Sequence, residues 1–80
     1  MKQVTVRFFA AFREAAGRET EQVESAAATV GELFSELCQR HDGLVHEPSA
    51  LVAVNDDMSS WDAGFETGDE ILFFPPVAGG

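Results

Sequence analysis

Hydrophobic and polar residues alternate near the start of the chain. Residues 3–9 place Val4, Val6 and Phe8 on one face, and the other face is polar except for Phe9. This period of two is typical of a strand buried on one side. Residues 10–17 then read as a helical turn or loop closed by glycine, and residues 20–24 as a short polar strand. The opening segment is therefore predicted to be a hairpin with an enlarged connection.

A helical period follows. Thr29 and Glu32 have the spacing of a capping box, which predicts a helix that begins at about Val30. Gly43 is a suitable residue to end it. The residues that recur at helical spacing form the predicted core stripe: Val30, Leu33, Phe34, Leu37, Cys38 and His41.

The second half of the chain predicts two more strands. Residues 51–55 form a continuous apolar run, which is typical of a strand buried on both faces. Residues 70–74 place Ile71 and Phe73 on one face and Leu72 and Phe74 on the other. If the helix covers the first pair, the second pair either forms a docking patch or covers neighbouring loops.

The order of these elements predicts an α+β fold of the β-grasp, or ubiquitin-like, class. In this fold a mixed sheet of about four or five strands packs against one main helix. Eighty residues are enough for a single small domain, residues 1–80, with a flexible C-terminal tail at residues 75–80.

Charge narrows the possible partners. Fourteen acidic and five basic residues give a net charge of −9, which argues against nucleic acid and anionic membrane surfaces. A basic protein partner fits this charge, although the charge also serves solubility. Because Cys38 is the single cysteine and no apolar run could span a membrane, a cytoplasmic protein is expected.

No complete active site is evident in the sequence. Cys38, His41 and His46 lack the spacing of metal ligands, so neither a metal nor a bound cofactor is expected. The chemically usable group is the carboxylate of Gly80, at the end of the segment Pro75, Pro76, Val77, Ala78, Gly79 and Gly80. Prolines stiffen such a segment and glycines make it slender, so it suits insertion into a narrow cleft. Transfer of AMP to this carboxylate would let a sulfur nucleophile convert it to a thiocarboxylate.

Several segments together resemble the MoaD-like family, the small subunits of molybdopterin synthase, which are ubiquitin-like sulfur carriers. The resemblance covers essentially the whole chain. It is most specific in the Phe-Phe-Ala and Arg-Glu of residues 8–14 and in the ending, residues 73–80. Weaker matches are residues 29–33, 53–55 and 68–70.

The resemblance implies that the chain is not an enzyme on its own but the sulfur-donating subunit of a complex. In this family an ATP-dependent, E1-like (MoeB-like) enzyme adenylates the terminal glycine, here Gly80, and a sulfur donor supplies the thiocarboxylate. The tail then enters the large catalytic (MoaE-like) subunit, where sulfur passes to precursor Z and builds the dithiolene of molybdopterin. Phe74, Leu72 and Phe9 are candidate apolar contacts with partners, and Arg13 is a candidate polar contact.

Three other functions share these sequence features. A sulfur carrier for thiamine, cysteine or tRNA thiolation would use the same tail chemistry, although residues 10–17 favour molybdopterin over thiamine. A ubiquitin-like modifier would join Gly80 to an acceptor protein. A binding module would have a Gly-Gly ending without a chemical role.

Overall fold

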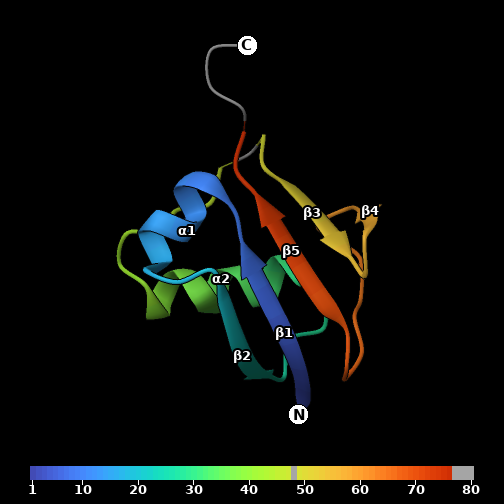
Figure 1. Cartoon of the computed structure of the whole chain (residues 1–80). Helices are drawn as coiled ribbons and strands as arrows, with labels where there is room; N and C mark the ends of the chain where they lie inside the picture. Colours follow the sequence, from blue (N-terminus) through green and yellow to red (C-terminus); the bar gives the residue numbers. More distant parts are fainter. Residues whose placement is uncertain (48, 77–80) are drawn as a thin grey trace.

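The computed structural model describes residues 1–47 and 49–76, and in this part of the chain strands and helices alternate as far as the main helix and three strands follow it (Figure 1). In chain order they are β1 (Lys2–Phe8), α1 (Ala10–Ala16), β2 (Thr20–Ser25), α2 (Val30–Arg40), β3 (Leu51–Val54), β4 (Asp57–Ser59) and β5 (Glu70–Phe74). The helical turn, the main helix and the first and last strands lie where the sequence predicts them.

The strands form one mixed sheet in the order β2-β1-β5-β3-β4. The central pair, β1 and β5, is parallel, with Val6 opposite Ile71 and Phe8 opposite Phe73. All other neighbours are antiparallel. Because β1 and β5 run the same way, the end of β5 lies at the opposite end of the sheet from the N-terminus (Figure 1). This architecture confirms the predicted α+β, β-grasp fold.

Local sequence signals define the helix ends. The Thr29 hydroxyl accepts a hydrogen bond from the Glu32 amide at 3.1 Å, and the Glu32 carboxylate accepts one from the Ala28 amide at 2.8 Å. Gly17 ends α1 in the left-handed region at a φ of 76°, which glycine adopts without strain. The predicted role of Gly43 is wrong, because α2 ends at Arg40 and is followed by His41 in an extended conformation.

The core fills the space between α2 and one face of the sheet. Val30, Leu33, Phe34 and Leu37 of α2 are fully buried in the same cluster as the inward side chains of β1 and β5. Phe73 lies at the centre, with its ring 4.7 Å from that of Phe34 and stacked on Trp61 at 5.8 Å. Within residues 1–47 and 49–76, no helix lies over the other face of the sheet (Figure 1).

Two predictions for the region 51–59 need correction. Within β3 only Val52 and Ala53 are buried, whereas Leu51 is 55% exposed, so the strand is not buried on both faces throughout. The strand β4 was not predicted. It follows a turn in which Asn55 and Asp56 both have positive φ, and three residues are too few to show a period.

Candidate functional site

Strand β5 leads directly into the tail. Phe74 is its last residue, Pro75 is half-buried and Pro76 is exposed. The four positions predicted to enter a partner or carry chemistry, Val77, Ala78, Gly79 and Gly80, lie outside the described residues. The described part of the site is therefore the anchor of the tail and the surfaces around it.

Apolar side chains gather on the open face of the sheet beside this anchor. We call this surface the open-face patch. Its members are Phe9, Leu51, Met58, Leu72 and Phe74. Strand alternation and register bring them together, because Leu72 and Phe74 share a face and lie opposite Ala53 and Leu51 of β3. Phe9 continues from β1 and stacks on Phe74, with ring centres 4.6 Å apart and planes 15° apart.

Exposure differs sharply within the patch. Leu72 is only 6% exposed and Phe74 is half-buried, whereas Met58 is 60% exposed. Leu72 therefore forms the floor of the patch and the more exposed side chains form its surface. The structure thus brings together three of the predicted contact residues, Phe9, Leu72 and Phe74.

Leu51 and Met58 are members that the sequence reasoning missed. Leu51 was assigned to a strand buried on both faces, and Met58 lies on the unpredicted strand β4, opposite Ala53. The alternation of Leu51 and Ala53 relative to Val52 and Val54 is a signal that could have identified Leu51. Nothing in the local sequence of three residues identifies Met58.

Arg7 borders the patch on the side of β1. Its guanidinium carbon lies 5.6 Å from the centre of the Phe9 ring, and its nitrogens lie 3.7 Å from Glu70 and 3.8 Å from Glu19. Because all three charged groups are substantially exposed, these ion pairs contribute little to stability. They do place a charged rim beside an apolar surface, an arrangement common at protein interfaces.

Arg13 stands apart from this arrangement. It is exposed on α1, and its side chain takes part in none of the ion pairs or hydrogen bonds found within residues 1–47 and 49–76. Its predicted contact with a partner stays a prediction.

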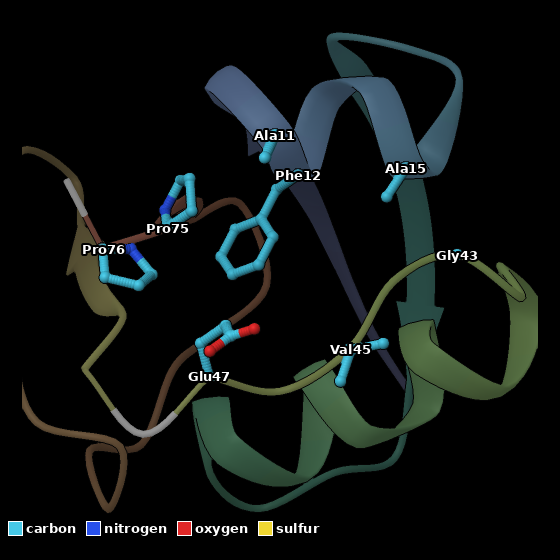
Figure 2. A pocket seen from close by; sticks show the side chains of 8 residues that line it. All are labelled: Ala11, Phe12, Ala15, Gly43, Val45, Glu47, Pro75 and Pro76. Atoms are coloured by element: carbon cyan, nitrogen blue, oxygen red, sulfur yellow. The ribbon is translucent and has the colours of Figure 1, made fainter. Parts of the chain in front are cut away.

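A hollow of about 390 Å³ lies at the root of the tail. Its walls come from α1, from the loop between α2 and β3, and from the two prolines (Figure 2). The lining residues are Ala11, Phe12, Ala15, Gly43, Val45, Glu47, Pro75 and Pro76. Gly43 lies close to α1 here, because a Cβ on it would be in van der Waals contact with Ala15, 3.4 Å from its carbonyl oxygen.

The side chains of the described residues offer little catalytic chemistry. Burial raises the pKa of the Cys38 thiol, and a backbone hydrogen bond at His46 offsets this only in part, so the thiol stays protonated at neutral pH. Within residues 1–47 and 49–76, no three His, Cys, Asp or Glu side chains are grouped to hold a metal ion. In the same residues no helix is long and apolar enough to cross a membrane.

Comparisons with known proteins agree with this geometry. The model of the ThiS family matches residues 6–80. A Haemophilus influenzae protein named molybdopterin synthase sulfur carrier subunit is 36% identical, over 96% of this chain and 99% of its own.

Solved structures of molybdopterin converting factors also match this chain. Subunit 1 of a molybdopterin converting factor from Pyrococcus furiosus superposes with a TM-score of 0.80 at 33% identity, over 96% of this chain and all of its own. A complex of subunits 1 and 2 of the molybdopterin-converting factor from Helicobacter pylori contains a chain that matches with a TM-score of 0.65 at 29% identity, over 98% of this chain and 99% of its own.

Proposed function

Because the chain belongs to the ThiS family, and its curated relatives are sulfur carrier subunits of molybdopterin synthase, we propose that it is the sulfur-donating small subunit of that enzyme. The observation that carries the proposal is the site anatomy. A central strand ends beside an apolar patch and continues through Pro75 and Pro76 into a Val-Ala-Gly-Gly ending. A partner can therefore grip the folded domain while it receives the chain end.

The proposed chemistry takes place on the carboxylate of Gly80. An E1-like enzyme transfers AMP from ATP to this carboxylate and releases pyrophosphate, which leaves an acyl adenylate. A sulfide equivalent from a sulfur donor then forms a carbon–sulfur bond as the carbon–oxygen bond to AMP breaks. The product is a thiocarboxylate. ATP is thus used by the activating enzyme, and the carrier itself needs no bound cofactor.

The next step takes place in a complex with the large catalytic subunit. The tail from Pro75 to Gly80 enters that subunit and delivers its sulfur to precursor Z, which builds the dithiolene of molybdopterin. The open-face patch supplies the apolar contact area, and removal of this area from water favours the complex. The carrier recognises both partners in the cytoplasm and contributes no catalytic side chain.

The intact mass of the protein after incubation with ATP, the cognate activating enzyme and a sulfur source tests this proposal. We expect a mass gain equal to the replacement of one oxygen by sulfur, mapped to Gly80. The variant Gly80→Ala should fold normally, because the residue follows the described core, yet gain sulfur more slowly, since its Cβ crowds the reacting carbon. Deletion of Gly79 and Gly80 should abolish the gain.

Other outcomes would favour the competing functions. An unchanged mass with a demonstrably active enzyme would support a binding module. Attachment to an acceptor protein through an isopeptide bond would support a ubiquitin-like modifier. A thiocarboxylate that forms normally but does not yield molybdopterin with the large subunit and precursor Z would support a carrier for another thiolation pathway.

A further inference from the structure

The hollow at the root of the tail combines apolar walls with one acidic group. Figure 2 shows the Phe12 ring between Pro75 and the Glu47 side chain, so the ring and the carboxylate adjoin the same space. Within residues 1–47 and 49–76, no hydrogen bond or ion pair involves the Glu47 carboxylate; only its backbone oxygen is bonded, to the Ala50 amide. The carboxylate is thus available to a group from outside.

The chemistry of the hollow selects the kind of group that would enter. Lysine and arginine carry an apolar stem that packs on hydrophobic surface and a cationic end that pairs with a carboxylate. The hollow has a volume of about 390 Å³, which leaves room for one such side chain. A purely apolar occupant would leave Glu47 desolvated without a partner, which is unfavourable.

The position of the hollow indicates which protein supplies this side chain. Pro75 and Pro76 form part of the wall and continue directly into the last four residues. Four extended residues span only about 14 Å, so a protein that holds the chain end must lie close to the hollow. Such a protein receives an anionic terminus and meets a chain with a net charge of −9, and both favour basic residues at its surface.

We propose that this hollow is a docking site for an arginine or lysine of the large catalytic subunit. The stem of that side chain packs between Phe12 and Pro76, and its charged end pairs with Glu47. The contact fixes the direction in which the tail leaves the folded domain. This inference rests on the proposed function, because it takes the large subunit as the protein that receives the tail.

The test measures the dissociation constant of the complex between the full chain, with an unmodified carboxylate terminus, and the purified large subunit. We expect Glu47→Gln to weaken the complex roughly tenfold and Glu47→Lys roughly a hundredfold, as for the loss and the reversal of a partly desolvated charge pair. Filling the hollow with Ala11→Trp should weaken it without any change in charge. Circular dichroism and thermal unfolding verify that each variant is folded.

Glu66→Gln is the matched control. It makes the same change in net charge, but Glu66 precedes β5, at the opposite end of the sheet from the tail. We expect its dissociation constant to stay within about twofold of that of the unchanged chain, as for a distant exposed charge. A charge swap completes the test: one Arg→Glu or Lys→Glu variant of the large subunit should bind Glu47→Lys better than the unchanged carrier.

The outcomes separate this inference from the proposed function. If both Glu47 variants and Ala11→Trp bind like the unchanged chain, the docking site is disproved, while sulfur loading of Gly80 can still be observed by mass. If Glu47→Gln and Glu66→Gln weaken binding equally, the effect is one of net charge and the docking site is also disproved. If the unchanged chain gains no sulfur and binds no large subunit, the proposed function fails and this inference fails with it.

Discussion

Glu21 is a buried acidic residue that joins two elements of the fold. Its side chain is 7% exposed, and one carboxylate oxygen accepts a hydrogen bond from Arg40 at 2.7 Å. The Nε2 atom of His41 lies 2.8 Å from the other carboxylate oxygen. Burial alone raises the pKa of Glu21, but the hydrogen bonds and charges of His41 and Arg40 outweigh it and hold the pKa below its ordinary value. The carboxylate therefore links β2 to the end of α2.

The lowered pKa of Glu21 predicts a pH-dependent contribution to stability. A carboxyl whose pKa is lower in the folded state stabilises the fold above its unfolded pKa, and this contribution is lost as the pH falls through the folded pKa. We expect Glu21→Ala to lower the free energy of unfolding by about 2 kcal/mol at neutral pH, because it removes the carboxylate that pairs with Arg40 and His41. The loss is smaller than for a fully buried pair, because Arg40 is half-exposed and regains water. Urea unfolding of both proteins at a series of pH values measures this.

The difference between the two proteins should shrink on acidification below the ordinary titration range of glutamate. The variant Glu24→Ala, on an exposed position of the same strand, should show a much smaller difference at every pH. A difference for Glu21→Ala that stays constant with pH would mean that packing, and not the charge of Glu21, holds β2 against α2.

At the scale of elements, the end of β1 presents adjacent phenylalanines to opposite faces of the sheet. Phe8 is fully buried in the core, where it lies against Phe73, whereas its neighbour Phe9 points to the open face and stacks on Phe74. Phe9 continues the extended backbone after β1, and consecutive residues of an extended segment face opposite sides, so the two phenylalanines lie in separate environments.

This separation predicts opposite phenotypes for two alanine variants. Phe8→Ala should cost about 3–5 kcal/mol of stability, because it leaves a cavity in the core. Phe9→Ala should cost only about 1 kcal/mol, the value of a half-buried aromatic pair, yet weaken the complex with the large subunit about tenfold or more. Urea unfolding and calorimetric binding measure the two effects.

Normal binding by a folded Phe9→Ala variant would contradict the role given to the open-face patch. In that case Leu72 and Phe74 would serve only to cover neighbouring loops, the alternative that the sequence leaves open. Thr5→Ala, on the same strand face but nearer the N-terminal end, is the control and should bind normally.

The elements that could be predicted from the sequence are those that local signals define. Thr29 and Glu32 specify the start of α2 through two hydrogen bonds to nearby amides, and alternation specifies the faces of β1 and β5. The exposure of Leu51 had a local signal in its alternation with Val52, but the continuous apolar run of residues 51–55 obscured it. The strand β4 depends on pairing with distant residues, so no local pattern reports it. The same holds for Glu21, since its partners lie about twenty residues away.

The candidate site also has a part that the sequence predicts and a part that it does not. Phe9, Leu72 and Phe74 could be placed on one surface from alternation alone, once the helix was assigned to the other face. The hollow could not be predicted from the sequence, because its walls come from α1, the loop after α2 and the tail root, which only the folded chain brings together. Glu47 was therefore indistinguishable in the sequence from the other acidic residues.

At the scale of the whole molecule, the basic residues are largely engaged by the chain itself. Arg40 pairs with Glu21, and Arg7 lies near Glu19 and Glu70. The Nζ atom of Lys2, the single lysine, donates to the Ala27 carbonyl at 3.0 Å and lies over the Phe65 ring. Because the chain has fourteen acidic residues and five basic ones, the electrostatic potential at its surface is strongly negative.

A negative surface potential predicts that salt slows association with the large subunit. Raising the ionic strength from 0.15 M to 1 M shortens the Debye length from about 8 Å to about 3 Å, so long-range attraction to basic groups is lost. We expect the association rate constant to fall about tenfold or more, while the dissociation rate constant changes little, since buried contacts hold the formed complex. Stopped-flow mixing measures both.

Phe9→Ala is the informative comparison, because it removes apolar contact without altering charge. Its association rate constant should show the same dependence on salt as that of the unchanged chain, and its weaker binding should reside in faster dissociation. An association rate constant that does not depend on salt would mean that the acidic surface keeps the protein soluble and plays no part in partner recognition. The open-face patch and the tail would then have to supply recognition by short-range contact alone.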